Sequence, residues 1–268
     1  MQPFFIDSRS GPLFAVYWKN PAQPLDKVIL HVPAFAEEMN KSRRMVTLQA
    51  NAFVQRGYSV LVPDLFGTGD SVGDYGEATW QIWLDNLTDA IAWLRALGNQ
   101  TVTLWGLRAG VLLALDYIHQ YPGSIEDVIA WQPVLNGDAF VTQVLRLRVA
   151  AAAMKNAGPS EKTKDLKQAL QNRQSLEVAG YKLHPDLINP LATLQVESFN
   201  LQSLKKLIIF EVAAAQDGGA SLGVQKFIQA FQDQAIDFLP FTGECFWATQ
   251  EITTAPNLIQ STTDRYCR

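Results

Sequence analysis

Short apolar runs rich in β-branched residues recur along the chain, separated by longer polar or amphipathic stretches. Continuous apolar runs of this length are typical of strands buried on both faces of a parallel sheet. Two further strand-like runs lie within residues 3–18 and flank a turn-forming segment at 9–12, which predicts an opening hairpin. With the runs at 27–32, 59–63, from 101, 127–131, 205–212 and 236–241, the pattern predicts eight strands.

Amphipathic segments fill most of the gaps between these strands. Residues 43–56 carry apolar side chains at helical spacing, with Ser42 placed to cap the first turn and Gly57 to end the last. Further helices are expected at 79–97, directly after Gly110, at 222–233 and near 248–252. Strands that alternate with helices require a mainly parallel sheet, so the predicted fold class is α/β.

The alternation breaks between residues 137 and 194. An apolar helix-like run is followed there by a polar, lysine-rich one around 161–174. We expect this segment to be a helical cap, inserted into a core made of residues 1–136 and 195–268. A chain of 268 residues with 48% hydrophobic residues is long enough to bury one sizeable core, and a second independent domain is not expected.

Residues 101–120 run from an apolar strand through two glycines directly into a helix, and the turn at 106–110 reads Gly-Leu-Arg-Ala-Gly. This turn resembles the nucleophile elbow of α/β-hydrolases, Gly-x-Ser-x-Gly, whose serine stands at the top of the sheet. The resemblance implies an α/β-hydrolase fold with an eight-stranded sheet. Arg108 occupies the position of the serine, and a guanidinium, which stays protonated in proteins, cannot attack an acyl group.

The other members of a hydrolase triad are also in doubt. The base is expected in the loop after the last strand, which reads TGECFWATQ and contains no histidine. The three histidines of the chain, His31, His119 and His184, all lie elsewhere. Asp217 stands where the acid is expected, in a glycine-rich loop where a carboxylate also serves turn formation.

The loop after the strand at 27–32 corresponds to the oxyanion loop of a hydrolase. Backbone N–H groups of Phe35 or Ala36 and of Ala109 are expected to converge there. Glu37 and Glu38 follow in the same loop. Because an unpaired buried cation is costly, Arg108 needs a negative partner, which is either one of these glutamates or a carboxylate or phosphate of a ligand.

Three side chains outside the elbow are weaker candidates. Trp131 stands at the end of a core strand, and Trp247 lies in the loop after the last strand. Each of them is expected to line a ligand pocket or, alternatively, to pack in the core. Cys245 lies where the histidine is missing, but no histidine is placed to activate it, so an inert thiol is expected. The candidate catalytic residues are therefore Arg108, Glu37, Glu38 and Asp217, and the candidate ligand-binding residues are Phe35, Ala36, Arg108, Ala109, Trp131, Cys245 and Trp247.

Charge and composition exclude several function classes. The net charge is −4 and the sequence has no long run of basic residues, so binding to nucleic acid or to anionic membranes is not expected. The two cysteines show no metal or disulfide spacing, and neither a metal nor a cofactor is expected. The N-terminal residues do not resemble a signal peptide, and no apolar run reaches the length of a membrane span. A cytoplasmic protein with a small-molecule ligand, anionic or sugar-containing, is the expectation; the pattern leaves its oligomeric state open.

Four segments resemble one particular family. HVPAFAEEMNKSRRM, RGYSVLVPDLFGTGDSVGD, LWGLRAG and FWATQEITTAPNL together are similar to the α/β-hydrolase-fold proteins called exosortase A system-associated hydrolase 2. The resemblance covers most of the chain and is weakest in the predicted cap. It implies a bacterial protein encoded beside exosortase and exopolysaccharide genes, and an arginine at the elbow in other members as well. It does not supply a substrate.

The sequence is compatible with two functions. The first is a hydrolase or transferase acting on an acylated or glycosyl intermediate, in which Arg108 stabilises negative charge and Glu37 or Glu38 acts as acid or base. The second is a non-catalytic protein that uses the former active-site pocket to bind an anion, a sugar or a protein partner. The retained elbow favours the first, and the missing serine and histidine favour the second.

Overall fold

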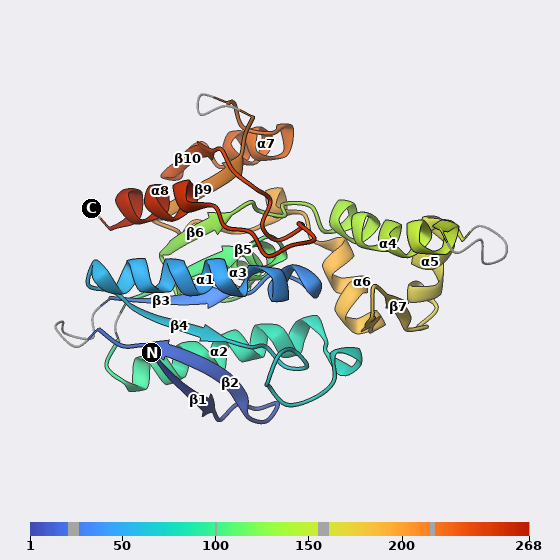
Figure 1. Ribbon diagram of the computed structural model, residues 1–268, viewed down its shortest axis with the longest axis horizontal. Helices are drawn as coiled ribbons and strands as arrows, with labels where there is room; N and C mark the ends of the chain where they lie inside the picture. Colours follow the sequence, from blue (N-terminus) through green and yellow to red (C-terminus); the bar gives the residue numbers. More distant parts are fainter. Residues whose placement is uncertain (21–26, 100, 155–160, 215–217, 268) are drawn as a thin grey trace.

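An eight-stranded sheet organises the protein, in the order β1-β2-β4-β3-β5-β6-β9-β10. The computed structural model describes residues 1–20, 27–99, 101–154, 161–214 and 218–267 (Figure 1). The strands are β1 (Gln2–Ile6), β2 (Leu13–Trp18), β3 (Lys27–Val32), β4 (Ser59–Pro63), β5 (Thr101–Leu107), β6 (Asp127–Trp131), β9 (Lys206–Val212) and β10 (Ile236–Phe241). All eight strands predicted from the apolar runs are therefore present.

Strand directions follow the sequence pattern. β1 and β2 form an antiparallel hairpin, and β2 joins β4 antiparallel. All other neighbours are parallel, because a helix or a longer segment connects them. The prediction of a mainly parallel α/β sheet is confirmed.

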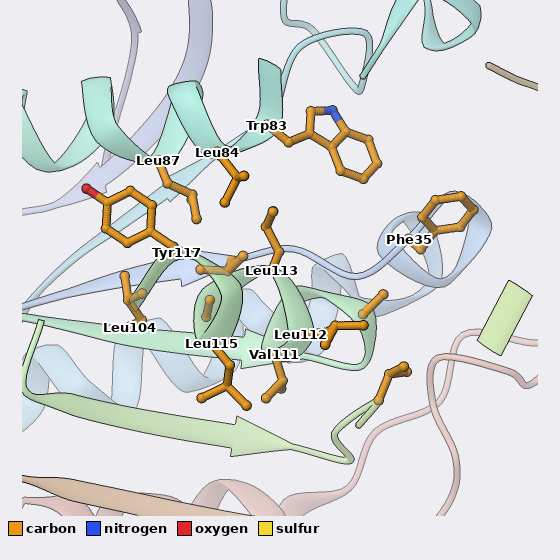
Figure 2. Packing of buried hydrophobic residues seen from close by; sticks show 14 of the residues in the cluster. Phe35, Trp83, Leu84, Leu87, Leu104, Val111, Leu112, Leu113, Leu115 and Tyr117 are labelled. Atoms are coloured by element: carbon orange, nitrogen blue, oxygen red, sulfur yellow. The ribbon is translucent and has the colours of Figure 1, made fainter. Parts of the chain in front are cut away.

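Helices cover both faces of the sheet and divide the core into two clusters. One cluster contains α1 (Glu37–Gln55) and α8 (Pro256–Tyr266), and the other contains α2 (Trp80–Ala96), α3 (Ala109–Gln120) and α7 (Leu222–Ala230). Successive strand residues alternate between the clusters, as Ile129 and Val128 of β6 do. In Figure 2, Leu113 of α3 points toward Leu84 of α2 within the second cluster.

Two predicted helix boundaries were wrong. α1 begins at Glu37, six residues before the predicted start, and Ser42 lies inside it, with its hydroxyl donating to the Glu38 carbonyl. Glu37 and Glu38 suit a first helical turn because acidic side chains favour the positive end of the helix dipole. The C-terminal helix was expected near 248–252 but begins at Pro256, a residue pre-organised for the first helical position.

The segment between β6 and β9 lies to one side of the sheet, and we call residues 137–194 the insert (Figure 1). It contains α4 (Gly137–Met154), α5 (Thr163–Gln171), the antiparallel pair β7 (Leu176–Val178) and β8 (Tyr181–Leu183), and α6 (Pro185–Thr193). The hairpin and α6 were not anticipated. The division into core and cap stays a prediction, and no helix among the described residues is long and apolar enough to cross a membrane.

The loop after β4 is held by one buried carboxylate. Asp64 accepts two hydrogen bonds from the Arg43 guanidinium, at 3.0 and 3.2 Å, and one from the backbone N–H of Asp70 at 3.0 Å. The Ser71 hydroxyl donates to the Asp64 carbonyl at 2.7 Å. These contacts brace the loop and tie it to α1.

The two glycines of the elbow are required by close backbone approach. A Cβ on Gly110 would lie 2.3 Å from the Val32 carbonyl oxygen and 2.4 Å from that of Pro33. A Cβ on Gly106 would lie 2.7 Å from the Cα of Val111. Backbone atoms cannot give way as flexible side chains do, so α3 packs against β3 and β5 only with glycine at these positions.

Gly110→Ala is expected to lower the free energy of unfolding by about 3 kcal/mol, because the new methyl group overlaps two carbonyl oxygens. Equilibrium unfolding in urea measures the change. Gly219→Ala is the matched control, since no atom lies within 4 Å of its added Cβ, and it should leave stability nearly unchanged. Equal effects of the two substitutions would contradict the packing role of Gly110.

Candidate functional site

Arg108 stands between β5 and α3 in the strained backbone conformation of an elbow, with φ 56° and ψ −120°. Its N–H donates to the Trp131 carbonyl at 3.0 Å. Its own carbonyl accepts from the N–H groups of Val111 at 3.0 Å and Val134 at 3.2 Å. A positive φ costs a non-glycine residue on the order of 1–3 kcal/mol, and these backbone hydrogen bonds hold it.

The Arg108 side chain forms an ion pair with Glu38 from the first turn of α1. Nε donates to Glu38 Oε1 at 3.1 Å, and the two side chains are only 11% and 21% exposed. The guanidinium carbon also lies 5.9 Å from the ring centre of Phe140 and 5.8 Å from that of Trp247. Of the two arrangements expected for Arg108, the structure contains the internal ion pair, lined on its sides by aromatic rings.

The ion pair provides a hydrogen-bond partner for only one of the two carboxylate oxygens of Glu38. Its second carboxylate oxygen, Oε2, is buried and has no hydrogen-bond partner among the described residues. Burial raises the pKa of Glu38 above its ordinary value, and the neighbouring Arg108 opposes that rise. Glu38 is therefore a carboxyl group whose negative charge is stabilised mainly by Arg108, with a smaller contribution from Lys41.

Glu37 connects α1 to the insert. Its Oε2 accepts from the Tyr181 hydroxyl at 3.1 Å and from the Asn40 side-chain amide at 3.4 Å. The same amide donates to the Tyr181 hydroxyl at 2.7 Å. Burial and the nearby Glu37 raise the pKa of Tyr181 to about 12, so this hydroxyl keeps its proton at neutral pH.

A cavity of about 90 Å³ lies between the insert and the start of α1, and we call it the elbow pocket. Its acidic side is formed by Glu37 and Glu38. The remaining walls are mostly apolar and include Phe35, Ala36, Phe140, Val144, Leu147, Val178 and Leu183. Glu38 and Phe140 contact Arg108 as well, so they connect the pocket with the elbow.

Of the three expected oxyanion residues, two line the elbow pocket. Phe35 and Ala36 line the elbow pocket, and Ala109 follows Arg108 as the first residue of α3. Ala36 has φ 50° and ψ −126°, nearly the conformation of Arg108, and likewise stands directly before a helix. Two helix N-termini thus begin with the same sharp turn beside the elbow.

Trp131 does not belong to the site, so its assignment as a ligand-binding residue was wrong. Its ring is fully buried and donates from Nε1 to the Thr262 hydroxyl of α8 at 2.9 Å. It also packs edge-on against Trp105, 4.8 Å between ring centres. The alternation of side chains along β6 points this residue into the core cluster beneath α1 and α8.

Trp247 and Cys245 are placed differently. Trp247 is buried and lies against the Arg108 guanidinium. Cys245 is exposed, and desolvation of its thiol raises its pKa although Arg108 opposes the change. A raised pKa leaves little thiolate at neutral pH, which is the opposite of an activated nucleophile. Asp217 lies outside the described residues.

The three histidines have structural partners away from the elbow. His31 is buried in β3 beside Trp105, hydrogen-bonds through Nδ1 to the Trp105 carbonyl at 3.0 Å, and burial lowers its pKa to about 3. His119 accepts from the Asn200 N–H at 2.9 Å, and His184 caps α6 by accepting from the Asp186 N–H at 3.1 Å. None is bonded to Arg108, Glu38 or Cys245.

Sequence reasoning missed the residues that the insert contributes. Phe140 sits in the apolar run that predicted a helix, but periodicity cannot tell that it faces Arg108. Tyr181 and Asn40 gave no signal, because their contact joins residues 141 positions apart. Only the convergence of the insert with α1 creates this part of the site.

Arg108→Gln is expected to destabilise the protein by about 3 kcal/mol at pH 7, because it leaves the Glu38 carboxylate largely buried without its cation. Burial alone places the folded-state pKa of Glu38 above its unfolded value of 4.5. The folded protein therefore takes up the proton first, and the loss should shrink as the pH falls toward 4.5. Urea unfolding at both pH values measures it.

The double variant Arg108→Gln/Glu38→Gln serves as the control. It removes both charges, so its stability relative to the native protein should depend far less on pH in this range. A loss in Arg108→Gln that is equal at pH 4.5 and pH 7 would show that the charge of Glu38 is not the cause.

Residues 17–203 match the family model of serine aminopeptidases, S33. No curated protein sequence matches the chain. Among solved structures, Est1E from Butyrivibrio proteoclasticus with ferulic acid bound is similar at a TM-score of 0.71 and 16% identity, covering 98% of this chain and 95% of that one. An esterase from Pyrococcus furiosus is similar at a TM-score of 0.60 and 15% identity, covering 99% and 86%. A serine hydrolase homologue from Coxiella burnetii also has a TM-score of 0.60, at 12% identity and 99% and 97% coverage. The chain belongs to the serine aminopeptidase S33 family and has the α/β-hydrolase fold.

Proposed function

We propose that this protein is a non-catalytic member of its fold family that binds a small molecule in the elbow pocket. One observation carries the proposal: the position of the nucleophile holds Arg108, already paired with Glu38 and enclosed by Phe140 and Trp247. The nucleophile position thus carries an internal ion pair, and the loop after the last strand contains no histidine to act as a base. What remains of the former active site is a cavity with mostly apolar walls.

The side chains at the site do not provide the nucleophile and the base that acyl transfer requires. A triad needs a nucleophile with a histidine in hydrogen-bond reach, and the histidines are engaged elsewhere. Cys245 has a raised pKa and no general base. Glu38 could take up a proton, but its partner is a permanently charged guanidinium instead of a reacting group.

A ligand in the elbow pocket is consistent with the surroundings of that pocket. It lies at the end of the sheet where the parallel strands β3 and β5 give way to α1 and α3, the usual place for ligands in open α/β sheets. The Est1E structure, which shares the fold, holds ferulic acid. Here the insert provides one wall and the start of α1 the other, so a bound ligand would contact both.

A hydrolase remains the second candidate, because the elbow keeps its strained backbone. Arg108 would then stabilise negative charge, and Glu38, with a raised pKa and one unpartnered oxygen, would act as acid or base. This reading requires a substrate that is attacked by water and not by a side chain. Activity toward aryl esters or thioesters that is lost in both Arg108→Ala and Glu38→Gln would favour it over simple binding.

The biological setting we propose is a bacterial exosortase and exopolysaccharide system. It rests on the sequence motifs alone, since the family match extends to the S33 family and no further. Within the motif EEMNKSRR, Glu38 bonds Arg108, Asn40 bonds Tyr181 and Arg43 bonds Asp64. Two of these three contacts, those of Glu38 and Asn40, belong to the site.

A fluorophosphonate probe is expected to leave every serine of the native protein unlabelled, because no serine in the described part of the chain is hydrogen-bonded to a histidine. Arg108→Ser should also stay unlabelled, since it restores a hydroxyl at the elbow without a base. Mass spectrometry of the intact protein measures the label, with an active serine esterase treated in parallel. Stoichiometric labelling of the native protein would overturn the proposed function.

The binding function itself is tested by thermal shift with a panel of carboxylates, sugar phosphates, acyl thioesters and uncharged amphiphiles. A ligand at one hundred times its Kd stabilises the folded state by about 2.7 kcal/mol, which is a readily detected shift in Tm. Phe140→Ala should reduce the shift, as Phe140 lines the pocket. A panel without any shift would count against a small-molecule binder.

A further inference from the structure

We propose that the elbow pocket and an exposed apolar stripe on α4 together bind an unbranched alkyl amphiphile, whose head group donates hydrogen bonds and carries no negative charge. This inference rests on the proposed binding function and adds to it the chemical class of the ligand. Three features carry it: the shape of the stripe, the size of the pocket and the charge around its polar end.

The stripe consists of Leu147, Ala150, Ala151 and Met154, which follow the spacing of one helix face at i, i+3, i+4 and i+7. Leu147 is 56% exposed and Met154 is 87% exposed, and both alanines are exposed as well. α4 packs its other side against α5, α6 and β7, and Figure 1 shows it reaching away from the sheet. No described residue covers this apolar face.

The stripe continues into the pocket through Leu147. This side chain lines the cavity together with Val144, one turn earlier on α4, while also starting the exposed face. From Leu147 to Met154 the helix rises about 10 Å at 1.5 Å per residue. The two alanines lie between the larger side chains of Leu147 and Met154, so the apolar surface is lower in the middle and forms a shallow groove. A linear chain can therefore leave the pocket along α4 without crossing polar surface.

The small volume of the pocket favours a narrow chain over a ring. The cavity holds about 90 Å³, whereas an apolar cavity that encloses benzene measures about 150 Å³. A narrow alkyl segment fits, contacts Phe35 and Phe140, and extends its remaining methylenes outward.

The charges at the inner end select the head group. Glu37 and Glu38 both line the pocket, and Glu38 Oε2 has no partner among the described residues. The nearby cation, Arg108, is already bound to Glu38. A carboxylate or phosphate would face two acidic side chains and would have to displace Glu38, whereas a hydroxyl or an ammonium group can donate to the carboxylate oxygens.

Calorimetric titration of the native protein with n-alkanols and n-alkylamines of increasing length, below their micelle concentrations, tests the inference. Affinity is expected to rise about fourfold per added methylene until the chain end passes Met154, and then to level off. Fatty acids of equal length are expected to bind at least about tenfold more weakly than the amines, because of like-charge repulsion.

Leu147→Ser is expected to weaken binding about tenfold and to flatten the dependence on chain length. The residue is more than half exposed, so the change should spare the fold. Leu222→Ser is the matched control, because Leu222 is 76% exposed on α7, lines no part of the pocket, and should leave binding unchanged.

The outcomes separate this inference from the proposed function. Absence of amphiphile binding, tighter binding of fatty acids, or equal effects of the two serine variants would overturn the inference, even if another compound class shifts Tm. Serine labelling by the fluorophosphonate would overturn the proposed function, whatever the titrations give. Chain-length dependence that requires Leu147 supports both.

Discussion

The ion pair between Arg108 and Glu38 is the constraint around which the site is built. Both residues stand at the beginning of a helix, where the backbone already supplies positive potential from unpaired N–H groups. A guanidinium at the start of α3 adds to that potential and is unfavourable on its own. Glu37 and Glu38 in the first turn of α1 supply the compensating charge. In a hydrolase the same two helix starts would favour an oxyanion, whereas here the negative charge is part of the protein.

The insert depends on this arrangement and completes it. Phe140 contacts the guanidinium from α4, and Tyr181 bonds Glu37 from β8. Two segments of the insert are therefore fastened to this charge arrangement, one at Arg108 and the other at Glu37. The elbow pocket lies beside these contacts, with side chains of the insert on one side and the start of α1 on the other. A change in the charge of Glu38 would act on the elbow and on the pocket wall together.

The strands and the mainly parallel sheet could be predicted because strands buried on both faces of a parallel sheet have continuous apolar runs in their sequence. The pairing of Arg108 with a glutamate could also be predicted, because the elbow and the oxyanion loop occupy known, neighbouring positions in this fold. Trp131 was misplaced because a strand position alone does not say which face of the sheet a side chain takes, and that parity is set by register. Phe140, Tyr181 and the exposed stripe on α4 depend on how the insert packs, which no local pattern of residues encodes.

The retained elbow is weak support for retained catalysis, because packing alone accounts for it. Gly110 lets α3 approach the carbonyls of Val32 and Pro33, and Gly106 lets β5 approach Val111. Hydrogen bonds from Arg108 to Trp131 and from Val134 to Arg108 fix the turn and anchor the end of β6. The sharp turn is thus required to place α3 on the sheet, whatever side chain stands at its apex. Function must be judged from that side chain and its partners, and these form a closed ion pair beside an apolar cavity.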